Sequence, residues 1–369
     1  MASITKRGSS YQVKWREPSG RWKSQTFPKW AQANRHKSRV ESELHAGTYL
    51  EAGRGEVKVA DWVQQQLDAR TDLASSTRTR TQGIIDSHIN PKWASDGLKA
   101  VEHGDVQEWV KELLQGLSVR SVKKIVNVLS AAFDAAIRDR RVSFNPCAGI
   151  RYPKVAPKGK IFLSAEQVHQ LANATFDDRQ KLIVYTLAYT GLRWGELAGL
   201  RVRDFDPLRR RLNVEQTIVE AGGRVEVKPP KDNEIRSVPM PKFLVEMVAE
   251  DVRGKDVDDL IFTAPRGGPL RNRNERGRWF DQAAESIGVP ELTPHGLRHT
   301  AASMAISAGA SVLSVQRMLG HSSATVTLDV YSSLFEDDLD EVAERLDRMH
   351  DAARVPNVFP SGVVRELPN

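Results

Sequence analysis

The sequence has 369 residues, enough for two or three domains that each bury a core. Its 40% hydrophobic and 27% charged residues exclude a disordered or fibrous chain, and no apolar run approaches the ~18 residues of a membrane span. A single cysteine, Cys147, excludes an internal disulfide and a multi-cysteine metal site. Because the N-terminus is polar and basic where a secretory signal is apolar, we expect a cytoplasmic protein with no membrane partner.

The net charge of +7 is distributed unevenly along the chain. Residues 1–40 hold ten Lys or Arg and one acid, a net charge of +9, so the other residues sum to −2. A compact basic block favours a polyanionic partner, because each neutralised phosphate releases counterions. The alternative is a basic end that only keeps the chain in solution. The strand-like pattern of the block favours the first interpretation.

Residues 1–56 are predicted to form a small sheet followed by a helix. Tyr11, Val13 and Trp15 alternate with polar residues, which is the period of a half-buried strand. The predicted elements are strands at 4–7, 11–16 and 21–27, a turn at 18–20 and a helix at 29–46.

A sheet with Arg and Lys side chains on one face is a known way to contact a DNA groove. In this unit we expect such contacts from Lys14, Arg16, Arg21 and Lys23. A unit this small needs large apolar residues to fold, so its tryptophans are expected in the core rather than stacked on DNA bases. These are Trp15, Trp22 and Trp30.

The second predicted unit, residues 57–155, is helical. One helix face is formed by Trp62, Val63 and Leu67. A second face follows at 3.6-residue spacing and contains Val122, Ile125, Val126, Leu129 and Phe133. Prolines at positions 146, 153 and 157, within a basic stretch, mark the end of this unit.

The third predicted unit spans residues 156–352 and is followed by an extended tail at 353–369. Ser164 is the expected N-cap of its first helix, with Gln167 at the capping-box position. After it we predict a buried helix at 182–189, a hairpin of strands 211–219 and 224–228, a strand at 235–240 and helices to about 349. The whole is predicted to be a multidomain α+β fold: a small N-terminal sheet plus helix, a helical domain, and a mainly α domain with a small antiparallel sheet.

Four short segments of the third unit hold side chains that can bind phosphate. Arg193 follows a helix end at Thr190-Gly191 and precedes a new helix, whose N-terminus is favourable for an anion. Lys231 falls in the turn predicted between the second and third strands.

The other two segments lie nearer the C-terminus. His295 and Arg298 follow a Thr-Pro helix start, and their i,i+3 spacing puts them on one helix face. His321 follows a Leu-Gly pair, and Tyr331 lies ten residues further on. Each segment alone is weak evidence, because helix-surface ion pairs and core tyrosines have the same appearance.

Together, these residue types suit a reaction that breaks and rejoins DNA without hydrolysing it. A tyrosine hydroxyl keeps the phosphate as an ester, but its pKa of about 10 means that it needs a base or local positive charge. Two arginines can hold the non-bridging oxygens and stabilise the transition state. A lysine can protonate the leaving 5′-oxygen. Such a reaction needs neither metal nor ATP, so we expect no cofactor.

The order and spacing of these segments resemble the tyrosine recombinase (phage integrase) family over about residues 160–335. The first two units resemble that family in kind, as an arm-type DNA-binding domain at 1–56 and a helical core-binding (SAM-like) domain at 57–155. The resemblance implies that 156–352 is the catalytic domain.

The resemblance also implies a role for each site residue. Tyr331 is the expected nucleophile, forming a 3′-phosphotyrosine link, and Arg193 and Arg298 hold the scissile phosphate. We expect His295 to be the general base and His321 to donate a hydrogen bond to the phosphate.

Lys231 is the expected general acid. Its rival Lys228 falls on a strand and lacks the Pro-Lys-x-x-x-x-Arg-x-Val-Pro setting of Lys231. Ile235 departs from the serine that the family often has before that arginine. Glu196 is expected to support Arg193, and His299 is expected to be structural. In a basic run next to this site, Arg271 and Arg273 are expected to contact DNA phosphates.

As a whole the chain is predicted to be a site-specific DNA recombinase that integrates, and with a partner excises, a phage or other mobile element. By resemblance it would act as a homotetramer on double-stranded DNA with core and arm sites, in a bacterial cytoplasm. A host DNA-bending protein and an excisionase are the usual partners of such enzymes. The alternatives are a type IB topoisomerase, or a catalytically silent DNA-binding regulator on the same fold.

Overall fold

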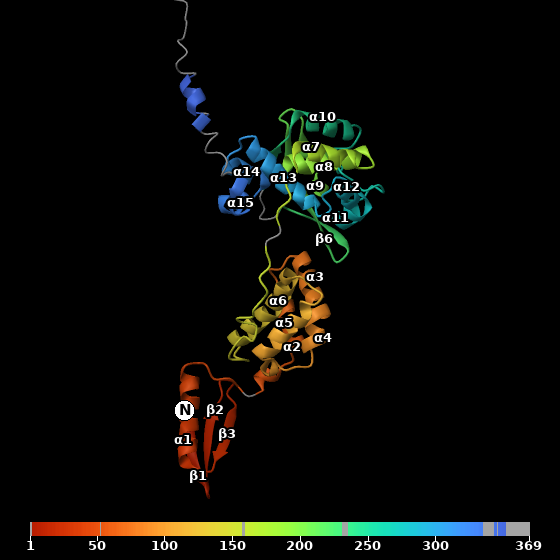
Figure 1. Cartoon of the computed structure of the whole chain (residues 1–369). Coiled ribbons are helices and arrows are strands. Elements are labelled where there is room, and N and C mark those ends of the chain that lie inside the picture. Colours follow the sequence, from red (N-terminus) through yellow and green to blue (C-terminus); the bar gives the residue numbers. More distant parts are fainter. Residues whose placement is uncertain are drawn as a thin grey trace, which may run out of the picture. The chain divides into compact units, whose positions relative to one another are not determined.

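The computed structural model describes residues 2–51, 53–156, 159–230, 235–334, 343–344 and 346–351 (Figure 1). The chain divides into two compact units, Met1–Pro157 and Lys158–Asn369. Both units carry the mixture of helices and small sheets that the sequence predicts, so the α+β fold class is confirmed. In the part of the chain so described, no helix is both long and apolar enough to cross a membrane.

The first unit begins with a three-stranded antiparallel sheet covered by one helix (Figure 1). Its elements are β1 (Ser3–Arg7), β2 (Ser10–Arg16), β3 (Trp22–Phe27) and α1 (Trp30–His45), and the strand order is β1-β2-β3. Val13 and Trp15 of β2 are buried against Ala33 and Val40 of α1. The alternation along β2 therefore leaves the opposite face of the sheet uncovered, and on it lie Lys14 and Arg16.

Only one of the three N-terminal tryptophans lies in the core. Trp15 is buried and its Nε1 donates a 2.7 Å hydrogen bond to Tyr49. The expectation of burial is wrong for Trp22 and Trp30, whose exposed fractions are 67% and 55%. The register explains Trp22: it pairs with Arg16 and so shares the uncovered face. Trp30 is the first residue of α1.

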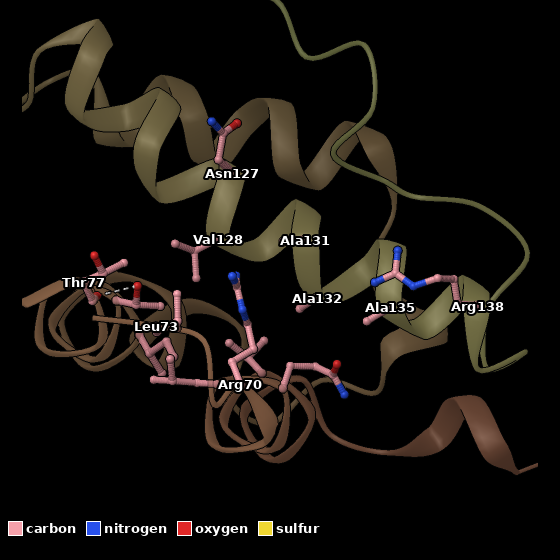
Figure 2. Close-up of a pocket in the computed structure, with 14 residues that line it drawn as sticks. Arg70, Leu73, Thr77, Asn127, Val128, Ala131, Ala132, Ala135 and Arg138 are labelled. Carbon is pink, nitrogen blue, oxygen red and sulfur yellow. Dashed lines mark hydrogen bonds between the residues drawn. The ribbon is translucent and has the colours of Figure 1, made fainter. Parts of the chain in front are cut away.

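A helical bundle with its own core makes up the rest of the first unit. Its helices are η1 (Arg54–Glu56), α2 (Val59–Ala69), α3 (Ser75–Ile84), η2 (Ile85–Ile89), α4 (Asn90–Trp93), η3 (Leu98–Ala100), α5 (His103–Leu113) and α6 (Val119–Arg138). The two predicted apolar faces meet in this core, where Trp62 of α2 donates a 2.8 Å hydrogen bond to the carbonyl oxygen of Ala132 in α6. Between α2, α3 and α6 a hollow of about 440 Å³ remains, and Figure 2 shows its lining.

The second unit is mainly helical. Its helices are α7 (Ala165–Asn173), α8 (Asp178–Thr190), α9 (Trp194–Gly199), η4 (Val202–Asp204), α10 (Lys242–Asp251), α11 (Asn272–Glu275), η6 (Arg276–Phe280), α12 (Asp281–Ser286), α13 (Pro294–Ser307), α14 (Val312–Leu319), α15 (Ala324–Tyr331) and η7 (Ser332–Leu334). Helix α8 is buried along most of its length and packs against α7, α10 and α13. The predicted capping box is present, with Ser164 and Gln167 exchanging hydrogen bonds of 3.1 and 2.9 Å.

Two small antiparallel sheets complete the second unit. One has the order β4 (Phe205–Asp206), β5 (Arg211–Val214), β8 (Arg236–Pro239), and the other is a hairpin of β6 (Thr217–Ala221) and β7 (Arg224–Lys228). The single strand predicted at 211–219 is therefore wrong: it breaks at Glu215-Gln216 and its halves join different sheets. The break is held where the Gln216 side chain donates a 2.8 Å hydrogen bond to the carbonyl oxygen of Gly199.

Candidate active site

The end of α8 forms one wall of the site. Gly191 closes this helix with a φ of +66°, in the left-handed region that favours glycine. Its carbonyl oxygen accepts a 2.7 Å hydrogen bond from Nη1 of Arg298 in α13. The turn that the sequence predicts at Thr190-Gly191 thus anchors the arginine that lies 107 residues further along the chain.

Arg193 is the N-cap residue of α9, as its position after the turn predicts. Its Nη1 is 2.8 Å from Oε1 of Glu196, and its Nη2 donates a 2.9 Å hydrogen bond to the carbonyl oxygen of Gly320. Gly320 immediately precedes His321. The guanidinium of Arg193 therefore links the start of α9 to the loop that carries His321.

Glu196 is a buried carboxylate between two arginines. Besides Arg193 it contacts Arg236 of β8, at 2.9 Å from Nη1 and 2.7 Å from Nη2. Burial alone would raise the pKa of Glu196, but hydrogen bonds and charge from Arg236, and then from Arg193, outweigh it and lower the pKa. Glu196 is thus charged at neutral pH and contacts both guanidinium groups.

Arg298 is the most buried cation of the site, with a 2% exposed fraction. Among the residues that the structure describes, its Nη2 has no hydrogen-bond partner. Burial, and next the charge of Arg193, lower the pKa of Arg298 to about 9. A buried donor without a partner costs about 1–3 kcal/mol, and more when it is charged. An anion bound here would satisfy that donor.

His295 and His321 face this group of arginines as neutral rings. Burial, followed by the charges of Arg298 and Arg193, lowers the pKa of both histidines, to about 4 for His321. Nδ1 of His321 lies 2.9 Å from the hydroxyl oxygen of Thr327, a buried residue of α15. This contact fixes the orientation of the His321 ring.

Tyr331 ends α15 with its side chain 1% exposed. Its ring stacks on His321 at 6.4 Å between centroids and 11° between planes, and its hydroxyl oxygen lies 2.8 Å from Nδ1 of His299. Burial raises the pKa of Tyr331 to about 12, while the charge of Arg298 acts in the opposite direction. The five predicted residues Arg193, His295, Arg298, His321 and Tyr331 thus come together from α9, α13, α15 and the loop between α14 and α15.

The structure adds three residues that sequence reasoning left without a role in this site. Arg236 holds Glu196, and its signal in the sequence is its fixed place five residues after Lys231 in the Pro-Lys-x-x-x-x-Arg pattern. Lys160 donates a 2.6 Å hydrogen bond to the carbonyl oxygen of Val330, next to Tyr331, although it precedes the first helix of the unit. His299 contacts the hydroxyl of Tyr331, and no sequence spacing indicates that contact.

The remaining predicted residues have different surroundings. Lys231 lies outside the described residues, and its rival Lys228 lies on β7, 2.8 Å from Glu226. Arg271 forms an ion pair of 3.2 Å with Glu220 of the hairpin. Arg273 is exposed and lines a hollow of about 650 Å³ that His295 also lines.

In the first unit the register divides the predicted DNA-contacting residues. Lys14 and Arg16 project from the uncovered face of the sheet. Lys23 pairs with the buried Trp15, so it belongs to the face that α1 covers, and Arg21 lies just before β3. Exposed Trp22 joins the face that Lys14 and Arg16 share.

Known solved structures share this fold. The Tn1549 transposon integrase in complex with a circular intermediate DNA aligns with a TM-score of 0.68 at 22% identity, covering 79% of this chain and 99% of that one. A lambda integrase dimer bound to a COC′ core site aligns with a TM-score of 0.58 at 19% identity, covering 89% of this chain and 93% of that one.

Relatives identified by sequence also include integrases and recombinases. The model of the phage integrase family matches residues 162–337. The chain is 26% identical to the ICEBs1 integrase of Bacillus subtilis over 72% of this chain and 75% of that protein. It is 30% identical to the tyrosine recombinase XerC of Halalkalibacterium halodurans over 66% of this chain and 81% of that protein. The chain therefore belongs to the tyrosine recombinase (phage integrase) family, a family of enzymes that exchange DNA strands.

Proposed function

We propose that this protein is an integrase that cuts and rejoins DNA at attachment sites through a 3′-phosphotyrosine intermediate. It integrates a phage or other mobile element and, with a partner, excises it. The observation that carries the proposal is the buried Arg298, whose Nη2 lacks a partner among the described residues and whose charge acts on the buried Tyr331. A phosphodiester supplies the anion that this donor requires, and the tyrosine supplies the nucleophile.

Each residue of the site has a defined task in this proposal. Arg193 and Arg298 hold the non-bridging oxygens of the scissile phosphate, and Glu196 keeps Arg193 in place. His321 donates a hydrogen bond to the phosphate and His295 lines the pocket beside it. Lys231 protonates the 5′-oxygen as it leaves.

The domain assignment follows the separate hydrophobic cores. We assign residues 1–56 to arm-site binding, 57–155 to core-site binding, 156–352 to catalysis and 353–369 to a tail. Support comes from separate clusters of buried side chains, one in each of the first two assigned domains and two in the third. It also comes from a division of the chain at residue 157, close to the proposed boundary. The small N-terminal sheet is consistent with an arm-binding domain.

The mobile-element assignment rests on relatives. These include the ICEBs1 integrase and a putative prophage phiRv2 integrase of Mycobacterium tuberculosis, each 26% identical. Lambda integrase has been solved as a tetramer bound to a Holliday junction, and we propose that this chain also acts as a homotetramer on double-stranded DNA. A host DNA-bending protein and an excisionase are the proposed accessory partners, and the bacterial cytoplasm is the proposed location.

Covalent trapping tests this function with a mixture of DNA sequences in place of one chosen site. The protein is mixed, in EDTA, with labelled genomic fragments that carry random nicks, and the mixture is denatured in SDS. We expect covalently linked DNA with the wild-type protein and none with Tyr331→Phe, and sequencing of the linked DNA would identify the core site. DNA binding without any adduct would favour a silent regulator instead.

A further inference from the structure

We propose that His299 is a catalytic residue of this enzyme: its Nδ1 accepts the hydroxyl proton of Tyr331 as that tyrosine attacks the scissile phosphate. The inference rests on the proposed function and specifies its general base. The sequence indicates His295 for this role, by resemblance, and a structural role for His299.

The geometry favours His299 over His295. Nδ1 of His299 is 2.8 Å from the hydroxyl oxygen of Tyr331, within the reach that a general base requires. Among the described residues, no hydrogen bond joins His295 to Tyr331. The His295 ring instead packs edge-on against His299, at 5.1 Å between centroids, and so lies behind the ring that touches the nucleophile.

The ring of His299 is held in this position from several sides. Phe162 contacts it edge-on at 6.4 Å between centroids, and the Tyr331 ring does so at 5.7 Å. His299 also follows Arg298 directly in α13. One helix turn therefore carries both a phosphate-binding guanidinium and the group that contacts the nucleophile.

The charge states give the hydrogen bond its direction. Burial, and then the neighbouring His295, Lys160 and Arg298, lower the pKa of His299 to about 4. Burial raises the pKa of Tyr331 to about 12. Before DNA binds, the proton therefore belongs to Tyr331, and the neutral His299 accepts it at Nδ1 and carries its own hydrogen on Nε2.

Substrate binding shifts this balance toward proton transfer. The titratable and charged groups around His299 are His295, Arg298, Lys160, His321 and Tyr331. A hollow of about 410 Å³ is lined by His299, His295 and Lys160, and Glu291 is the acidic residue in its lining. A phosphodiester bound at Arg298 brings a negative charge into this mainly cationic environment. That charge favours the imidazolium form of His299. Proton transfer is thereby tied to the presence of DNA.

The step balances without a further reactant. The O–H bond of Tyr331 breaks and its proton moves to Nδ1 of His299, while the tyrosine oxygen forms a bond to phosphorus. The bond from phosphorus to the 5′-oxygen breaks, and that oxygen takes a proton from the general acid, proposed above as Lys231. In the return step the 5′-hydroxyl of the partner strand attacks the phosphotyrosine and its proton passes to the deprotonated Lys231. The bond from phosphorus to the tyrosine oxygen breaks, and Tyr331 recovers its proton from His299.

The first test separates proton transfer from positioning. In His299→Asn the side-chain oxygen can take the place of Nδ1 as a hydrogen-bond acceptor, but it cannot accept the proton. On the nicked core site recovered by trapping, we expect single-turnover adduct formation at pH 7 to fall by about 10²- to 10⁴-fold in both His299→Asn and His299→Ala. Thermal melting of each variant verifies that it is folded. A His299→Asn rate within about threefold of the wild-type rate would overturn the proposal. So would a His299→Ala rate above the wild-type rate.

The second test separates the base from the acid. A core site with sulfur in place of the bridging 5′-oxygen has a leaving group that needs no proton. With this substrate the rate of adduct formation by Lys231→Ala should return toward that of wild type. The rate of His299→Asn should stay low, because only the general acid becomes dispensable. The rate of His299→Asn should also rise about tenfold per pH unit from 6 to 9, as hydroxide replaces the lost base, while the wild-type rate stays level. Rescue of His299→Asn by sulfur would contradict the assignment.

The two proposals fail in different ways. If the wild-type protein forms no adduct with any DNA, the recombinase function itself fails. If the wild-type protein forms the Tyr331 adduct but the His299 variants keep its rate and its pH dependence, only the inference about His299 fails.

Discussion

At the scale of single residues, the site depends on one carboxylate among three cations. Glu196 offsets the positive charges of Arg193 and Arg236, and Arg298 lies near them without a carboxylate of its own among the described residues. Removing one partner of a buried ion pair is strongly destabilising because the remaining charges stay buried. The carboxylate therefore stabilises the fold and also arranges the arginines that we propose bind the phosphate.

Glu196→Gln keeps the size of this side chain and removes its charge. We expect the free energy of unfolding of the second unit to fall by about 3 kcal/mol or more at pH 7. The lowered pKa of Glu196 means that the ionised carboxylate contributes stability above its ordinary value of 4.5, and that this contribution is lost as the pH falls through the lower folded value. Melting curves from pH 7 to pH 3 should therefore show the two proteins converging at acid pH. A constant difference would contradict this account.

At the scale of elements, close packing of α9 on the hairpin positions Arg193. A Cβ on Gly195 would lie 2.5 Å from the carbonyl oxygen of Ile218 and 2.6 Å from the hydroxyl oxygen of Thr217. Backbone cannot move aside as a flexible side chain can, so β6 and the first turn of α9 must separate if a methyl group is added there.

Gly195→Ala is therefore expected to destabilise the second unit by about 1–3 kcal/mol and to reduce adduct formation, since Arg193 caps the displaced helix. Gly277→Ala is the matched control: a Cβ there meets no atom within 4 Å. Calorimetry and the trapping reaction should show loss for the first variant and little change for the second. Equal stability and equal adduct formation in the two variants would show that the close approach of Gly195 to β6 is unimportant.

The N-terminal sheet presents a second element with a testable face. Lys14→Ala with Arg16→Ala removes two charges from the uncovered face, whereas Lys37→Ala with Arg39→Ala removes two from α1 on the other side. If the uncovered face binds arm-site DNA, the first pair should weaken binding and reduce the slope of log affinity against log salt by about 2. The α1 pair should leave that slope near wild type. If the slope of log affinity against log salt falls only in the variant with Lys37→Ala and Arg39→Ala, the DNA lies on the opposite face.

Across the whole molecule, the sequence predicts those features that follow from a local pattern of residues or from a fixed spacing. The Thr190-Gly191 turn, the Ser164 capping box and the alternation of β2 are local patterns, and the structure has all three. The break in the strand at Glu215-Gln216 depends on a hydrogen bond to distant Gly199, which no local pattern indicates.

Contacts between distant segments explain the other differences. The exposure of Trp22 depends on which sheet face α1 covers, and alternation alone cannot determine that face. His299 meets Tyr331 across 32 residues, and its neighbour Arg298 carries the motif by which the segment is recognised. The motif therefore predicts which arginines and histidines come together, while the contact of His299 with Tyr331 becomes visible only in the folded chain.

The residue that becomes covalently attached to DNA can be identified chemically. The trapped complex is digested with nuclease and protease, and mass spectrometry locates the nucleotide-modified peptide. We predict a 3′-phosphate ester on Tyr331 and on no other residue, absent from Tyr331→Phe and formed in the presence of EDTA. An adduct on a different side chain, or one that persists in Tyr331→Phe, would contradict the account of this site.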